Sequence, residues 1–145
     1  MPLERISFPD VEKNLIDYLK SELTALGDSA LVVAKMPDPK PARVVRVFRD
    51  DRRRRQDVED REGHRGTFLI LDRPRMVLEC QADDGTAAVL ARTVRSILTG
   101  SFPRYIGAMW VDDIEDAGVE NDTDPVTAAP RYVVTADLYV RGTVL

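Results

Sequence analysis

The chain has 145 residues, of which 43% are hydrophobic and 32% charged, and its formal net charge is −4. A chain of this length buries about 70% of the surface that its extended form exposes, so we expect one domain. The small net charge excludes bulk electrostatic binding to nucleic acid or to an acidic membrane. No apolar run approaches the roughly 20 residues that span a bilayer, no apolar leader follows Met1, and Cys80 is the only cysteine. We therefore expect a protein of a reducing cytoplasm, without an intrachain disulfide or a membrane partner.

The first expected element is a helix over residues 8–26. Its apolar residues recur three and four positions apart and form one stripe, which is typical of a helix that packs on a core. Ser7 or Asp10 is expected to cap its first turn, and Gly27 to end it. The stripe consists of Val11, Leu15, Tyr18, Leu19, Leu23 and Leu26.

Two strands and a charged segment are expected next. Residues 30–36 and 43–49 have the composition of strands, and the three prolines between them exclude a helix or a central strand there. Residues 50–66 are almost entirely charged and predict a projecting loop. Beyond that loop we expect short strands over residues 67–71 and 75–82.

A second helix is expected over residues 84–99, with Gly100 at its end. One face is apolar and predicts contact with the sheet, while Arg92 and Arg95 lie on the opposite face. The apolar stripe consists of Ala87, Leu90, Ala91, Val94, Ile97 and Leu98. Residues 104–114 then predict a strand, and residues 112–124 predict an acidic loop.

The chain closes on a segment that alternates between apolar and mostly polar residues, the pattern of a long, half-buried strand. Its apolar positions are Tyr132, Val134, Ala136, Leu138 and Val140. Because only a few residues follow, we expect this strand in the body of a sheet. The elements together predict an α+β two-layer sandwich, with two amphipathic helices on one face of an antiparallel or mixed sheet.

Residues 112–124 carry seven acidic side chains and no basic one. A Ca²⁺ or Mg²⁺ site is one interpretation, but the spacing lacks the glycine and the final glutamate of the hand-type calcium loop. A solvated loop is favoured, and a pore lining or a subunit contact is the functional alternative. The candidate residues for that role are Asp112, Asp113, Glu115 and Asp116.

The charged segment opens with four consecutive arginines, which can neutralise phosphates. Acidic residues in the same segment nearly cancel that charge, however, and no aromatic residue is interleaved for base stacking. A contact with a neighbouring subunit or another protein explains both signs of charge, and a solvated loop is the alternative. The candidate contact residues are Arg52, Arg53, Arg54, Arg55, Arg92 and Arg95.

No set of residues in the sequence indicates catalysis. His64 is the only histidine and lies in a charged, glycine-flanked segment, so we interpret it as a solvated loop residue. Cys80 alternates with Leu78 and Ala82, which predicts a small buried hydrophobic residue. Phosphate-binding glycine loops, nucleophile elbows and paired-histidine helices are missing. We expect no enzymatic activity, no cofactor and no metal.

Several segments resemble, in their order and spacing, the tail terminator proteins of long-tailed bacteriophages, most closely those of phages that infect actinobacteria. These proteins are also called tail completion or head-to-tail connector proteins. The segments are residues 8–12 (FPDVE), 37–49 (PDPKPARVVRVFR), 77–82 (VLECQA) and 130–143 (PRYVVTADLYVRGT). The charged segment departs from the family pattern because it is longer and richer in arginine.

The resemblance implies a mixed α+β fold that assembles into a ring, expected to have six subunits. Such a ring caps the tail tube, stops its polymerisation and binds the connector or stopper protein on the head side. Genomic DNA passes through the pore without sequence-specific binding. The expected location is the neck of the virion, after assembly in the host cytoplasm.

Three other functions remain open from the sequence. Another neck component, such as a head-closure or stopper protein, would bind the portal-side adaptor instead of the tail tube. A small nucleic-acid-binding domain would bind DNA with a steep salt dependence. A small enzyme of unknown type has only the acidic residues in its favour.

Overall fold

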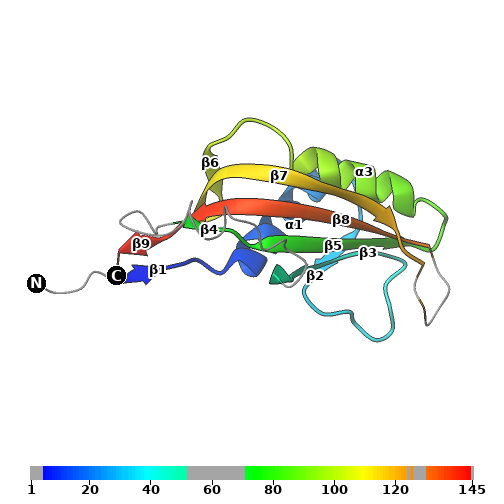
Figure 1. Ribbon diagram of the computed structural model, residues 1–145. Coiled ribbons are helices and arrows are strands. Elements are labelled where there is room, and N and C mark those ends of the chain that lie inside the picture. Colours follow the sequence, from blue (N-terminus) through cyan, green and yellow to red (C-terminus); the bar gives the residue numbers. More distant parts are fainter. Residues whose placement is uncertain (1–4, 52–70, 124, 126–129, 145) are drawn as a thin grey trace, which may run out of the picture.

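The computed structural model describes residues 5–51, 71–123, 125 and 130–144, and it places two helices on one face of a β-sheet (Figure 1). The helices are α1 (Val11–Ala25) and α3 (Ala87–Ile97). The strands are β1 (Ile6–Ser7), β2 (Leu31–Val33), β3 (Arg43–Arg49), β4 (Leu71–Asp72), β5 (Arg75–Ala82), β6 (Arg104–Ile106), β7 (Met109–Asn121), β8 (Arg131–Arg141) and β9 (Thr143–Val144). The predicted α+β fold is therefore confirmed.

The main sheet has the strand order β2-β3-β5-β8-β7-β6, and β4 pairs with one end of β8. Only β2 and β3 are parallel; the other paired strands are antiparallel. The closing strand β8 lies between β5 and β7, in the body of the sheet, as its alternating pattern predicted. A separate two-stranded ribbon pairs β1 with β9 at one end of the molecule (Figure 1).

Helix α1 begins after Asp10, whose carboxylate accepts a hydrogen bond from the backbone N–H of Lys13 at 3.1 Å. Of the two predicted capping residues, Ser7 and Asp10, it is therefore Asp10 that caps the helix. The helix ends where Gly27 adopts a positive φ of 78°. Leu26 was predicted to belong to the apolar stripe, and this is wrong, because it follows the last helical turn and is 63% exposed. The buried residues of the stripe are Val11, Leu15, Leu19 and Leu23.

All six residues of the predicted stripe on the second helix are buried. Arg43 on β3 links the two helices through its guanidinium group. Its Nε and Nη2 donate to the Asp28 carboxylate at 2.8 and 2.7 Å, and its Nη1 donates to Thr86 Oγ1 at 2.7 Å. The hydrogen bonds from Arg43 lower the pKa of Asp28. This arginine therefore fixes the end of α1 relative to the start of α3.

The opposite face of the sheet carries charged pairs among buried valines. Arg75 on β5 and Asp137 on β8 form a two-fold hydrogen-bonded pair, with both donor–acceptor distances at 2.7 Å. On the same face and four residues further along β5, Glu79 accepts a hydrogen bond from Arg46 at 2.9 Å. Asp137 is only 5% exposed and Glu79 only 8%, so both carboxylates need these partners. The valines are Val44, Val77 and Val133.

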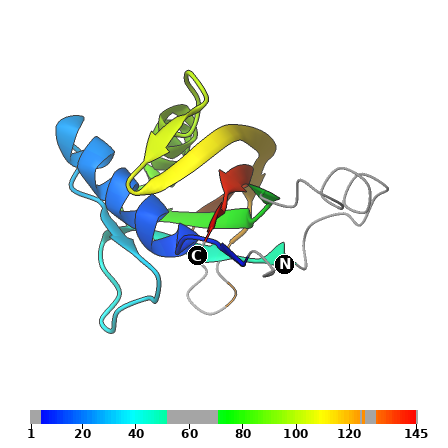
Figure 2. The same ribbon diagram turned by 90° about the vertical axis from the view of Figure 1, so that its left-hand side faces the viewer.

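Two predictions about the third quarter of the chain are wrong. Residues 104–114 form two strands, because Gly107 turns the chain with a φ of 61° between β6 and β7. Residues 112–124 are mostly strand instead of loop, since β7 continues to Asn121 in register with β8. Two irregularities in that register, between Val111 and Asp113 and between Asp116 and Gly118, accompany the strong bend of β7 that is visible in Figure 2.

The remaining differences concern the lengths of elements. The strand predicted over residues 30–36 is limited to β2, and the second helix is shorter at both ends than predicted. Of the strand predicted over residues 67–71, only Leu71 is described, and it belongs to β4. Almost all of the predicted charged loop, including His64, lies outside the described residues. No helix in the described part of the chain has the length and apolar composition to cross a bilayer.

Candidate interaction surface

The most distinctive surface of the described chain is the outer edge of β7. β6 covers this edge only at residues 109–111, where it pairs with the start of the strand. From Asp113 to Asn121, β7 pairs with β8 on its inner side, and no described strand pairs with its outer side. Five of the seven acidic residues that were assigned to a loop therefore lie on a strand held in place by the sheet, while Asp122 follows its end and Asp124 lies outside the described residues.

The register of β7 separates its acidic side chains into two sets. Asp113 and Glu115 lie opposite Tyr139 and Asp137 of β8, on the face of the sheet without helices, and Glu120 lies on that same face opposite Val133. Asp116 lies on the helix-covered face, opposite the buried Ala136. We call Asp113, Glu115 and Glu120 the acidic row; all three are exposed, and none forms a salt bridge with another described residue.

Asp116 and Arg95, two predicted contact residues of opposite sign, pair with each other. The Nε atom of Arg95 donates to the Asp116 carboxylate at 2.6 Å, which ties α3 to β7 within one subunit. Asp112 is engaged similarly, because it accepts from the indole N–H of Trp110 at 3.0 Å and pairs with Arg141 at 3.1 Å. These two carboxylates thus already have cationic partners within the chain, whereas no described cation forms a salt bridge with the acidic row.

The Arg95–Asp116 pair is exposed, so it contributes little to the fold. We expect Arg95→Ala to lower the free energy of unfolding by less than about 1 kcal/mol, the usual range for exposed ion pairs. Arg92→Ala is the matched control and should leave the free energy of unfolding unchanged. Arg92 lies three residues earlier on the exposed side of α3 and has no described salt-bridge partner. Urea denaturation of both variants measures the difference. A loss of several kcal/mol for Arg95→Ala alone would show that the pair is structural.

Glu115 has one polar neighbour that the sequence did not suggest. The hydroxyl group of Tyr139 on β8 donates to Glu115 Oε2 at 2.7 Å. Burial, followed by this hydrogen bond to a carboxylate, raises the pKa of Tyr139 to about 12. Tyr139 therefore stays protonated at neutral pH and holds Glu115 at the surface of the sheet, where its charge is open to a partner.

The opposite edge of the sheet is formed by β2 and differs in chemistry. β2 contains only Leu31, Val32 and Val33, and its outer side has no described strand partner. A hollow of about 370 Å³ lies beside it, lined by Lys20, Thr24 and residues 28–33. Leu31 is 51% exposed, which is unusual for a leucine on a strand.

A second hollow, of about 510 Å³, lies where the β1–β9 ribbon meets the β6–β7 turn. Tyr105 and Trp110 stack edge to face there with ring centroids 4.9 Å apart, and Arg141 completes the lining. These residue types are common in protein interfaces. Arg141 is the charged residue of this lining, and it already forms a salt bridge with Asp112. The hollow therefore gives no evidence of a ligand site.

The other predicted residues have clear positions or lie outside the described chain. Cys80 is buried on β5, as predicted, and burial raises the pKa of its thiol to about 12, so it is not a nucleophile at neutral pH. Among the described residues, no three His, Cys, Asp or Glu side chains form a group that could hold a metal ion. Arg92 is exposed on α3. Arg52, Arg53, Arg54 and Arg55 lie outside the described residues.

Glu120 was not among the residues expected to line a pore or contact a subunit, and residues 112–124 were treated as one acidic cluster. No period-two pattern marks this part of β7, because two irregularities interrupt its register with β8. Comparison with known proteins adds no assignment, because no protein family model and no curated protein matches this chain.

Proposed function

We propose that this protein is a tail terminator of a long-tailed bacteriophage. In this proposal its copies form a ring, with six subunits expected, that caps the tail tube, stops tube polymerisation and binds the connector on the head side. Genomic DNA passes through the ring. The protein acts in the neck of the virion and has no catalytic role.

The observation that carries the proposal is the pair of unlike, unpaired edges on one sheet. A ring with rotational symmetry needs two different surfaces on each subunit, since each contact joins one surface to a different one on the next copy. The acidic row on β7 and the apolar edge of β2 lie at opposite sides of the sheet and satisfy this requirement. The segments that resemble tail terminators give the second line of support.

The electrostatics favour this function over nucleic-acid binding. The net charge is negative, and most cations of the described surface are paired with carboxylates, as in the pairs of Arg43, Arg46 and Arg49. A surface of this kind lets a polyanion pass without strong attachment. A DNA-binding domain would instead present clustered, unpaired cations and bind with a steep salt dependence.

Tube capping can be measured with purified components. We expect this protein, added to polymerising tail tube protein of the same phage, to shorten the tubes and to appear as a cap at one end in electron micrographs. A protein of similar size and charge serves as the control. Tubes of unchanged length without caps would contradict termination, and binding to the portal-side adaptor alone would support the alternative of a head-closure protein.

A further inference from the structure

The edge of β2 lacks the features that normally prevent one sheet from pairing with another. Exposed edge strands are usually protected by charged residues, prolines or bulges. β2 has none of these within its three residues, and Leu31 is exposed on it beside the 370 Å³ hollow. Leu26, just beyond the end of α1, is 63% exposed as well. No described strand covers this edge, which therefore offers a surface that a further strand can extend.

Two lysines flank this edge. Lys20 lines the hollow from α1, and Lys35 follows β2 by two residues. Both are exposed, and neither forms a salt bridge with another described residue, whereas Lys13 pairs with Asp17 and Lys40 with Asp83. The two lysines of the chain that have no described salt-bridge partner thus lie near this strand, Lys20 in the hollow beside it and Lys35 just beyond its end.

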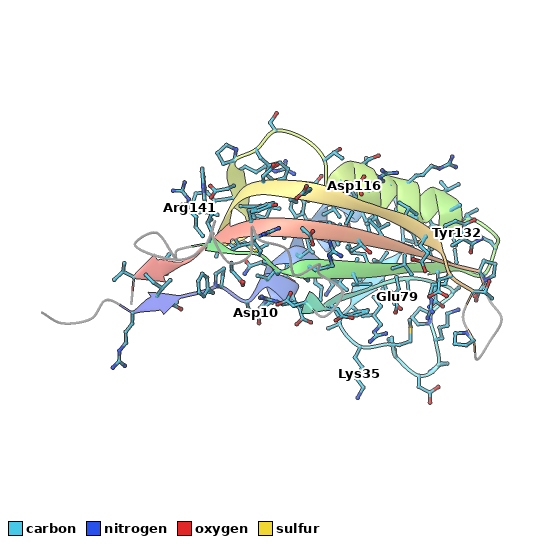
Figure 3. All side chains as sticks on the ribbon, viewed as in Figure 1. Asp10, Lys35, Glu79, Asp116, Tyr132 and Arg141 are labelled. Carbon is cyan, nitrogen blue, oxygen red and sulfur yellow. The ribbon has the colours of Figure 1, made fainter. Side chains whose placement is uncertain are left out.

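The outer edge of β7 carries the complementary charge. Between its two register irregularities the strand is regular from Asp113 to Asp116, a length comparable with that of β2. Asp113 and Glu115 lie on this stretch, and Glu120 follows beyond the second irregularity. In Figure 3, Lys35 points away from the molecule on the β2 side, while Asp116 marks the β7 side across the sheet.

We propose that the β2 edge of one copy docks against the β7 edge of a second copy, with Lys20 and Lys35 facing the acidic row. The sheet then continues from subunit to subunit. Each copy offers one edge of each kind, so the contact is head-to-tail and closes into a ring when the rotation permits. This inference rests on the proposed function, which expects a ring. It adds the two surfaces that form the contact between neighbouring subunits.

Two backbone donors of β7 explain why the edge is protected before assembly. The Asp113 carboxylate accepts the N–H of Ile114 at 2.9 Å, and the Asp116 carboxylate accepts the N–H of Gly118 at 2.9 Å. An incoming lysine competes for the Asp113 carboxylate and frees the Ile114 N–H for the new strand. Pairing is therefore conditional on the lysines, which disfavours indiscriminate edge-to-edge aggregation.

A charge exchange tests the contact. One variant, Lys20→Glu with Lys35→Glu, reverses the β2 side; the other, Asp113→Lys with Glu115→Lys and Glu120→Lys, reverses the β7 side. Each variant alone places like charges at the contact. We therefore expect its self-association, measured by sedimentation velocity, to be weaker than that of the original chain by about tenfold or more. An equimolar mixture restores opposite charges at both contacts and should associate like the original chain. Arg5→Glu, at an exposed position next to β1, is the control that leaves association unchanged.

Disulfide trapping tests the same contact inside particles, where the local concentration is high. Leu31→Cys with Glu115→Cys should give an oxidation ladder of crosslinked copies, because the native Cys80 is buried and does not contribute. Leu31→Cys with Lys13→Cys, at an exposed position on α1, should give none. Particles that contain the protein but yield no ladder, or a mixture that fails to recover association, would overturn the edge contact and leave tail termination standing. Particles that lack the protein would instead contradict the proposed function.

Discussion

Replacing Leu19 by alanine is expected to lower the free energy of unfolding by about 2–5 kcal/mol, the range for a large buried side chain cut back in a core. Leu19 lies at the middle of α1, is 0% exposed and belongs to the cluster that joins both helices to the sheet. The cavity left behind cannot be filled by rearrangement, because its neighbours on α1, Leu15 and Leu23, are themselves closely surrounded.

Leu26→Ala is the matched control on the same segment. Its side chain is 63% exposed and follows the helix, so we expect a change within about 0.5 kcal/mol. Urea denaturation followed by circular dichroism measures both variants. Equal losses for the two would mean that α1 does not pack on the sheet by the face that the structure assigns to it.

Asp137→Ala is expected to lower the free energy of unfolding by about 3–5 kcal/mol, because it leaves Arg75 without its main partner in a place with little access to water. Asp137 is 5% exposed and accepts two hydrogen bonds of 2.7 Å from Arg75 across the central strand pair. These bonds raise the pKa of Arg75 in the original chain. Even without them the ordinary pKa of a guanidinium lies far above neutral, so Arg75 stays charged in the variant and cannot lose its proton to relieve the loss.

Asp17→Ala is the control, since Asp17 belongs to an exposed pair with Lys13 on α1. Its removal should change the stability by less than about 1 kcal/mol. A double variant that replaces both Arg75 and Asp137 by apolar residues should be more stable than Asp137→Ala, because no unpaired charge remains. If Asp137→Ala behaved like Asp17→Ala, the Arg75–Asp137 pair would not be buried in solution.

The elements with a clear period could be predicted from the sequence. Both helices and the closing strand depend on long stripes of apolar residues, and all three pack by the faces that those stripes define. Helix and strand ends were less certain, since a single capping residue such as Asp10 decides them.

The part of β7 beyond Ile114 could not be predicted, because the pattern of the strand is broken by the two irregularities that the structure reveals. The shift between Val111 and Asp113 places Asp112 out of phase, and the shift between Asp116 and Gly118 does the same for Ala117. Aspartate and glycine also have low strand propensity, so pairing with β8 and not local preference keeps this segment extended.

The partners of the candidate residues could not be predicted either, because they depend on the tertiary fold. Arg95 and Asp116 are 21 positions apart and meet only when α3 packs over the sheet. Lys20 and Lys35 became candidates only once β2 proved to be an outer strand. Charge in the sequence therefore gave candidates for an interaction surface, and the sheet topology decided which of them enter the proposed contact.

Tail termination itself is tested most directly by electron microscopy of particles produced when this gene carries an early stop codon. We expect filled heads beside overlong tubes without heads, because nothing stops tube polymerisation. Tails of normal length lying unattached would place the protein at the joining step instead. Intact and infectious particles would contradict a role in the neck of the virion.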